Sequence, residues 1–262
     1  MKDRILSTLR QLAAQQGCRF LFAAESGSRA WGFASPDSDY DVRAIYVKPL
    51  EWYLAVEAAP KDTIEAMLPD ELDISAWELR KALRLFAGCN LPLCEWLTSP
   101  VQYDAAPDFL AEMRALIPLH FNPVKATHHY LALARQARAT TDANETISIK
   151  KLFYLLRGIL AARWCCQRQT MPPVLFTELL QDGILPNGLR AHVSELLEQK
   201  RGADEKARVE FSGDLRTFFD NGQQECPKQA AAIRHHAPPL ENLDAVLRKW
   251  VRQSQIFSAP MS

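Results

Sequence analysis

The sequence predicts an α+β protein with two domains, and three observations support this class. Strand-like and helix-like patterns alternate in residues 1–105, whereas almost every pattern from residue 106 onward is helical. Hydrophobic residues make up 48% and charged residues 24% of the 262 positions, which argues against disordered, collagen-like and coiled-coil chains. This length suits one or two domains, so we place a mixed domain at 1–105 and a helical domain at 106–262.

The first domain is expected to contain short strands after an N-terminal helix. An amphipathic helix pattern covers residues 1–16. An apolar run at 19–24 ends before Gly27 and predicts a buried strand. β-Branched and aromatic residues predict a second strand over 41–47, and a third, shorter strand is expected at 71–74.

Helices are expected in the rest of the chain. Ser75 and Glu78 have the spacing of a capping box, which predicts a helix that starts at Ser75 and stops at Gly88. Beyond residue 106, Pro and Gly separate successive helical patterns, and residues 227–239 resemble a loop. The helices predicted there span residues 107–117, 123–139, 146–168, 173–181, 187–200, 204–221 and 239–255.

Global features argue against several classes of function. The 31 Lys and Arg residues balance 31 Asp and Glu residues, so overall basic charge does not hold this protein to nucleic acid, although a local basic groove stays open. No apolar run is long enough to span a membrane and no signal-peptide core is present, so we expect a cytoplasmic protein. The six cysteines and six histidines lack the spacings of a local zinc site.

The residues that carry chemistry lie between Gly27 and Arg43. Asp39 and Asp41 are two positions apart at the entry to a strand, so their side chains are expected on one face, where they can bind Mg²⁺. Asp-x-Asp alone is common, and a solvated turn is the alternative. Gly27 and Ser28 follow a buried strand, where backbone amides and a hydroxyl can cradle a phosphate.

Two further charged residues are candidates for the same site. Asp73 lies in the third predicted strand and is expected to reach the pocket as a general base or a metal ligand. Arg43 shares a face with Asp39 and Asp41 if the strand is regular. Its guanidinium either binds a phosphate or pairs with an acid, and both interpretations stay open.

These motifs resemble the DNA polymerase beta-like nucleotidyltransferase superfamily, whose pattern is Gly-Ser, a spacer, Asp-x-Asp and a distant third acid. The string GSRAWGFASPDSDYDVR at 27–43 is similar to one bacterial branch, the YcgL-like group, also called the RNA repair pathway DNA polymerase beta family. Residues 72–81, 88–90, 95–100 and 150–157 resemble the same branch. The resemblance covers about residues 19–165.

The resemblance implies a nucleotidyltransferase domain with a mixed sheet, an all-helical C-terminal domain and an active site in the cleft between them. By analogy, Gly27 and Ser28 bind the triphosphate of an NTP, while Asp39, Asp41 and Asp73 hold two Mg²⁺ ions, with Mn²⁺ as an alternative. The implied reaction transfers a nucleoside monophosphate from the NTP to an acceptor hydroxyl and releases pyrophosphate. The branch name suggests an RNA end as acceptor, and a protein or small-molecule acceptor stays open.

A second group of candidates lies on a predicted helix of the C-terminal domain. Lys150, Tyr154 and Arg157 share one face by their spacing, and such a stripe can hold a triphosphate and stack a base. The alternative is an ordinary amphipathic helix with a charged rim. For the whole chain, the alternatives to an enzyme are a non-catalytic nucleotide- or RNA-binding module of the same fold and an interaction protein that uses its helical half.

Overall fold

The computed structural model describes residues 1–56, 61–69, 71–181, 183–202, 207–211 and 213–254, and it confirms the α+β class. The chain divides into two compact units. The first comprises residues 1–27, 39–120 and 237–262, and the second comprises residues 28–38 and 121–236. Packing therefore groups residues 106–120 with the first unit, whereas the predicted domains divide the chain at residue 105.

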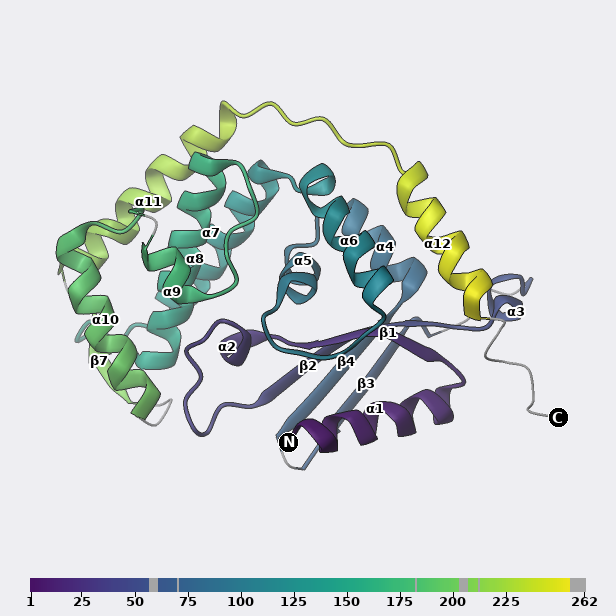
Figure 1. Cartoon of the computed structure of the whole chain (residues 1–262). Coiled ribbons are helices and arrows are strands. Elements are labelled where there is room, and N and C mark those ends of the chain that lie inside the picture. Colours follow the sequence, from purple (N-terminus) through teal and green to yellow (C-terminus); the bar gives the residue numbers. More distant parts are fainter. Residues whose placement is uncertain (57–60, 70, 182, 203–206, 212, 255–262) are drawn as a thin grey trace. The chain divides into compact units, whose positions relative to one another are not determined.

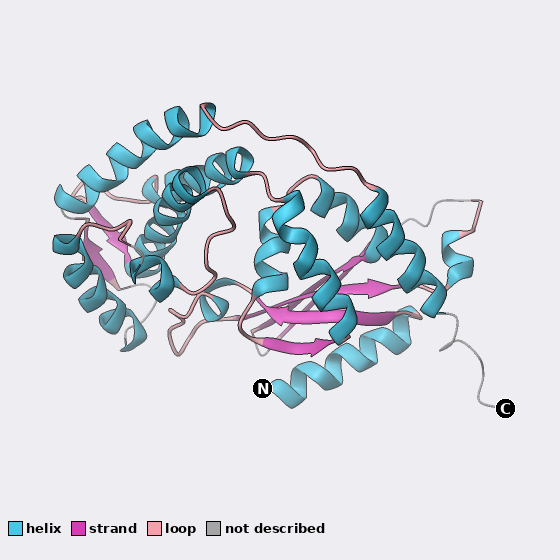
Figure 2. Ribbon diagram, turned by 45° about the horizontal axis from the view of Figure 1, so that its top comes forward, coloured by secondary structure: helices cyan, strands magenta, loops and turns pink. Residues whose placement is uncertain are grey.

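A mixed five-stranded sheet forms the centre of the first unit (Figure 2). β2 and β4 pair in parallel, and the other neighbouring strands pair antiparallel. In the described residues the spatial order is β3 (Thr63–Leu68), β4 (Leu72–Glu78), β2 (Tyr40–Val47), β1 (Arg19–Glu25) and β5 (Gln102–Ala105).

Helices cover both faces of this sheet (Figure 1). On one face, Ile5 and Leu9 of α1 (Lys2–Gln16) pack with Ala23, Val42 and Tyr46 into an apolar core. Strands covered on both faces form near-continuous apolar runs, and β1 accordingly has five successive buried residues from Leu21. The other face carries α4 (Leu79–Ala87), α5 (Leu91–Thr98), α6 (Pro107–His120) and α12 (Glu241–Ser254), and α3 (Leu50–Tyr53) follows β2.

The second unit is mainly helical. Its centre is α8 (Ile149–Arg168), which packs against α7 (Pro123–Arg138) and α11 (Gly213–Ala231). The remaining elements are α2 (Gly27–Ala30), which starts at the border between the units, α9 (Phe176–Gln181), α10 (Asn187–Gly202), and a two-stranded antiparallel sheet of β6 (Thr146–Ser148) and β7 (Arg208–Glu210).

The predicted capping box at Ser75 is wrong. Ser75 and Glu78 belong to β4, where buried and partly exposed residues alternate along the whole strand. The period of two therefore prevails over the local capping signal. α4 begins at Leu79, and the Glu78 side chain accepts the backbone N–H groups of Arg80 and Lys81. Its end at Gly88 is confirmed.

The three predicted strands are confirmed, while β3 and β5 were not predicted. β5 has four residues, too few for a clear pattern. Residues 146–148 form a strand before α8. Of the helix predicted at 204–221, residues 204–206 and 212 lie outside the described residues, and the rest contains β7 and the start of a helix at Gly213. α11 continues through Pro227 to Ala231, so the loop predicted at 227–239 begins later. None of the described helices is long and apolar enough to cross a membrane.

His120 is a buried titratable residue at the end of α6. It is 3% exposed, and its ring centre lies 5.2 Å from that of Phe86. Within the described residues, neither ring nitrogen has a hydrogen-bond partner. Burial lowers the pKa of this imidazole below its ordinary value, because the charged ring loses its hydration. The neutral form is thus favoured in the folded protein.

We expect the free energy of unfolding to fall as the pH drops from about 7.5 to about 5, below the ordinary His pKa of about 6.5. The folded-state pKa is depressed, so the unfolded chain takes up the proton first and is stabilised by it. Chemical denaturation at several pH values measures this slope. In His120→Leu the slope becomes shallower, and an unchanged slope would assign the pH dependence to other groups.

Candidate functional site

Asp41 and Asp73 are register partners in the parallel pair of β2 and β4. Neighbouring strands lie about 4.8 Å apart, so the two carboxylates start from adjacent backbone positions. Side chains alternate between faces along a strand, which places Asp73 on the same face as Trp77. The ring of Trp77 lies 4.2 Å from that of Trp96 in α5. The two acids therefore lie on the α5 side of the sheet, opposite α1.

Arg43 binds both carboxylates with one nitrogen. Its Nη2 lies 2.9 Å from Oδ1 of Asp41 and 2.7 Å from Oδ2 of Asp73. Nη1 donates to the carbonyl oxygens of Val42 and Asp73, at 3.1 and 3.2 Å. The Arg43, Asp41 and Asp73 side chains are 18%, 31% and 29% exposed. A cationic group thus bridges two acids at a position that solvent reaches, and we call these three side chains the Arg43 cluster.

The two residues after β1, Ser26 and Gly27, lie directly against Asp41, and we call them the Gly27 loop although Gly27 also begins α2. The Ser26 N–H donates to the Asp41 carbonyl at 2.9 Å. Gly27 has a φ of +62°, and a Cβ added there would lie 2.5 Å from Oδ2 of Asp41. Only glycine satisfies both the left-handed backbone and this close approach. From the sequence, phosphate binding explains the glycine at position 27. The close packing of Asp41 is an independent reason for a glycine at this position.

Glu25 is a buried residue of this region that the sequence argument missed. Its Oε1 accepts the backbone N–H of Asp41 at 2.7 Å, and its Oε2 accepts the Tyr103 hydroxyl. Its carbonyl accepts the Ser99 hydroxyl at 2.8 Å. Glu25 therefore joins β1 to the start of β2 and to β5. The available signal was an acid at the end of an otherwise apolar strand, immediately before the Gly27 loop.

Asp39 lies outside the Arg43 cluster. It precedes the first residue of β2 and is exposed, so the regular strand face predicted for Asp39 and Asp41 begins one residue too late to include it. The guanidinium of Arg43 bonds Asp41 and Asp73, not Asp39. In the described part of the chain, no three His, Cys, Asp or Glu side chains are grouped as metal ligands. The metal roles of Asp39, Asp41 and Asp73 stay predictions.

Residues 28–38 pack within the second unit. The Trp31 ring lies 5.1 Å from the Tyr154 ring and 4.7 Å from the Arg157 guanidinium carbon. Arg157 is 2% exposed, and its Nη1 donates to the carbonyl of Val174 at 2.8 Å. Its contacts are thus those of an interior residue rather than of a solvent-facing stripe. Ser28 is buried and Lys150 is half-buried, and the nucleotide contacts predicted for these residues stay predictions.

A second anchor of the same segment was also missed. Lys200 at the end of α10 is fully buried, and its Nζ donates to the Ser35 hydroxyl at 2.8 Å. The same ammonium lies 5.8 Å from the centre of the Phe33 ring. The spacer between Gly27 and Asp39 is therefore a packed structural segment. A charged residue near the end of a predicted helix gives no sequence signal for such burial.

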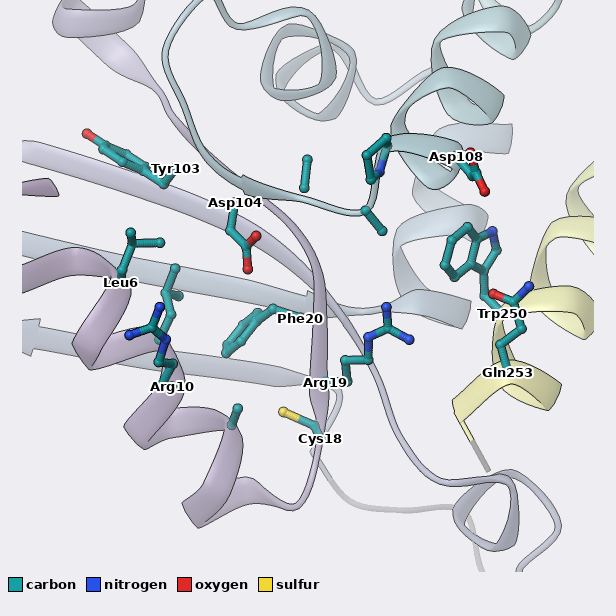
Figure 3. Close-up of a pocket in the computed structure, with 15 residues that line it drawn as sticks. Leu6, Arg10, Cys18, Arg19, Phe20, Tyr103, Asp104, Asp108, Trp250 and Gln253 are labelled. Atoms are coloured by element: carbon teal, nitrogen blue, oxygen red, sulfur yellow. The ribbon is translucent and has the colours of Figure 1, made fainter. Parts of the chain in front are cut away.

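A separate cavity of about 870 Å³ in the first unit is lined by residues of α1, β1, β5, α6 and α12 (Figure 3). Its lining includes Phe20 and Trp250, and charged side chains from Arg19 and Asp104. Tyr103 also lines it. None of the predicted site residues lines this cavity.

We expect Gly27→Ala to destabilise the protein more than Gly17→Ala. Both residues have a positive φ, but a Cβ at Gly17 meets nothing within 4 Å. Gly17→Ala should therefore lower the free energy of unfolding by about 1 kcal/mol through backbone strain alone. Gly27→Ala adds the displacement of the Asp41 carboxylate, for a total of about 2–3 kcal/mol. Equal losses in urea denaturation would contradict the close approach.

Glu25→Ala should lower the free energy of unfolding by about 2–3 kcal/mol, because the Asp41 N–H and the Tyr103 hydroxyl lose their acceptor. Tyr103→Phe removes one donor and should cost about 1 kcal/mol. The double variant tests the connection in a double-mutant cycle, where we expect less than the sum of the two losses. Strict additivity would mean that Tyr103 and Glu25 act independently.

Comparison with known proteins places the chain. The protein matches the uncharacterized protein YcgL of Bacillus subtilis (strain 168) with 43% identity over 213 residues, which is 80% of this chain and 82% of the relative. A crystal structure of a nucleotidyltransferase-like protein from Exiguobacterium sibiricum 255-15 aligns over 97% of this chain and 80% of its own, with 10% identity and a TM-score of 0.33. The family assignment therefore rests on sequence.

A family model matches residues 1–249, well beyond the segment at 19–165 that carries the sequence resemblance. The match includes the sheet with the Arg43 cluster and the helices of the second unit. The chain belongs to the RNA repair pathway DNA polymerase beta family.

Proposed function

We propose that this protein is a Mg²⁺-dependent nucleotidyltransferase that moves a nucleoside monophosphate from an NTP to an acceptor hydroxyl and releases pyrophosphate. The observation that carries the proposal is the register pairing of Asp41 with Asp73, with the Gly27 loop directly against Asp41. Family membership supports nucleotidyl transfer as the class of reaction. The acid pair supplies residues that such a reaction needs.

The donor set fits a hard divalent cation. Carboxylate oxygens are the ligands that Mg²⁺ and Mn²⁺ prefer. Arg43 places a positive charge between the two carboxylates, so the arrangement already accommodates a cationic group there. Asp41 and Asp73 would hold the metal, and Asp39, exposed just before β2, would complete the set. When bound, the metal neutralises phosphate charge and lowers the pKa of a coordinated hydroxyl.

The chain's own residues have separate parts in the proposed reaction. The loop at Gly27 would offer backbone N–H groups to the triphosphate, and the missing side chain of Gly27 lets the Asp41 carboxylate lie directly beside that loop. The acceptor oxygen forms a bond to the α-phosphorus, the bond from this phosphorus to the bridging oxygen breaks, and pyrophosphate leaves with the electron pair. Asp73 is the candidate base for the acceptor proton.

The acceptor that we propose is an RNA end, on the strength of the family name alone. Balanced charge means that RNA binding would depend on a local surface, and its affinity would still fall with added salt. A binding module that keeps the fold without catalysis would bind NTP or RNA but release no pyrophosphate. The two functions therefore separate in one assay.

Asp41→Asn and Asp73→Asn should each lower pyrophosphate release by at least about two orders of magnitude, because several kcal/mol of transition-state stabilisation depend on the metal ligands. The assay follows pyrophosphate with each NTP, Mg²⁺ or Mn²⁺, and an RNA pool. Asp62→Asn is the matched control. Asp62 is exposed, its Oδ1 lies 2.8 Å from Nζ of Lys81, and it does not belong to the Arg43 cluster. We expect it to keep wild-type activity.

Circular dichroism verifies that each variant is folded. Full activity in folded Asp41→Asn and Asp73→Asn would overturn the site. If the wild type binds an NTP but releases no pyrophosphate with any acceptor, the binding-module alternative replaces the enzyme.

A further inference from the structure

Arg43 and a divalent cation require the same carboxylate oxygens. Nη2 of Arg43 holds Oδ1 of Asp41, while Oδ2 of Asp41 is the oxygen that faces the Gly27 loop. The same nitrogen holds Oδ2 of Asp73. A metal bound between the two acids would therefore need the place that Nη2 of Arg43 occupies. Two cations cannot share these oxygens at contact distance without strong repulsion.

We propose that Arg43 is a displaceable internal counter-ion: it holds Asp41 and Asp73 together before the metal binds, and it leaves them when a divalent cation binds, so that its guanidinium becomes available to a nucleotide. The proposal rests on the proposed function and adds a competition within the same site. It predicts that Arg43 weakens metal binding by the protein alone. It also assigns the released guanidinium to a phosphate group of the substrate.

The surroundings of Arg43 suit a residue that can move. Its side chain and both acids are partly exposed, so water reaches the ion pairs and can take the place of a departing guanidinium. The two hydrogen bonds from Nη1 to carbonyl oxygens are longer than those to the acids. No aromatic ring among the described residues stacks on this guanidinium, unlike that of Arg157 on Trp31. Release therefore exchanges the hydrogen bonds to two carboxylates and two carbonyl oxygens for new partners, and it separates no ring stack in the described residues.

The released group is chemically suited to a phosphate. A guanidinium is planar and presents paired N–H donors that match phosphate oxygens. Arg43 is two residues from Asp41 in β2, so a phosphate near the metal-bound Asp41 lies within reach of a long side chain. The alternative is a permanent clasp that only ties β2 to β4. The two interpretations differ in the change of metal affinity that they predict when Arg43 is replaced: an increase for the counter-ion, and no change or a decrease for the clasp.

Mn²⁺ binding without nucleotide distinguishes them. We expect Arg43→Gln to bind Mn²⁺ about tenfold more tightly than the wild type, measured by isothermal titration calorimetry and by the electron paramagnetic resonance of free Mn²⁺. Arg43→Lys keeps a charge at the position and should stay closer to the wild type. Arg84→Gln is the matched control, since Arg84 is an exposed arginine on α4 of the same unit.

Equal or weaker Mn²⁺ binding by folded Arg43→Gln would overturn the proposal and favour the clasp. The gain must also disappear in Arg43→Gln with Asp41→Asn, because a gain that persists would come from another site. With Mg²⁺ present, Arg43→Gln should bind NTP more weakly than the wild type. Unchanged NTP affinity would overturn the transfer of Arg43 to a phosphate.

A measurement on the wild type covers the case in which Arg43→Gln does not fold. In protein labelled with ¹⁵N-arginine, the Arg43 guanidinium signal is identified by its absence in Arg43→Lys. Addition of Mg²⁺ should shift this signal and speed its rotation, and a signal that stays fixed while Mg²⁺ binds would overturn displacement. The proposed function can fail separately. Tighter Mn²⁺ binding by Arg43→Gln, without pyrophosphate release by the wild type, would support the counter-ion role and contradict the transferase activity.

Discussion

The parallel register of β2 and β4 is the constraint on which the candidate site depends. It brings together two acids, Asp41 and Asp73, that are far apart in the chain, and no local turn can do this. A shift of one residue in either strand would turn one carboxylate to the α1 face, among the apolar side chains of the core. The core residues Val42 and Ile74 flank the acids and fix this register by their burial. Packing on one face therefore determines the chemistry on the other.

The adjacent carboxylates of Asp41 and Asp73 repel each other, and contacts on both faces of the sheet hold them in place. Two like charges about 5 Å apart repel by about 3 kcal/mol at an effective dielectric constant of about 20. On the α5 side, Arg43 places its guanidinium between them. On the α1 side, Glu25 holds the backbone of Asp41 from behind, while its own carboxylate accepts a hydroxyl and an N–H group. The charge is thus partly compensated on one face, and the backbone is fixed on the other.

The sequence was sufficient for the parts of the site that lie close together in the chain. Gly27 and Asp41 belong to one recognisable string, and their contact is observed. Asp73 was reachable because its strand carries a readable pattern. Glu25 and Lys200 could not be predicted. Charged residues are rarely buried, and the hydrogen-bond partners of these two are distant in the sequence. The capping box predicted at Ser75 was wrong because a local sequence pattern contains no information about the pairing of β4 with β2, which extends the strand.

The length of the spacer between Gly27 and Asp39 is explained by packing, whereas the residues at its two ends are those that the sequence assigns to the chemistry of the candidate site. A tight turn would suffice to place a glycine and an acid at one end of a sheet. Residues 28–38 instead belong to the second unit, where Trp31, Phe33 and Ser35 find aromatic and cationic partners. Each of these residues is in the string that resembles the family, yet each makes packing contacts rather than contacts with the acids. Packing therefore explains part of the family motif. Within it, Gly27 lies against Asp41, and Arg43 binds Asp41 and Asp73.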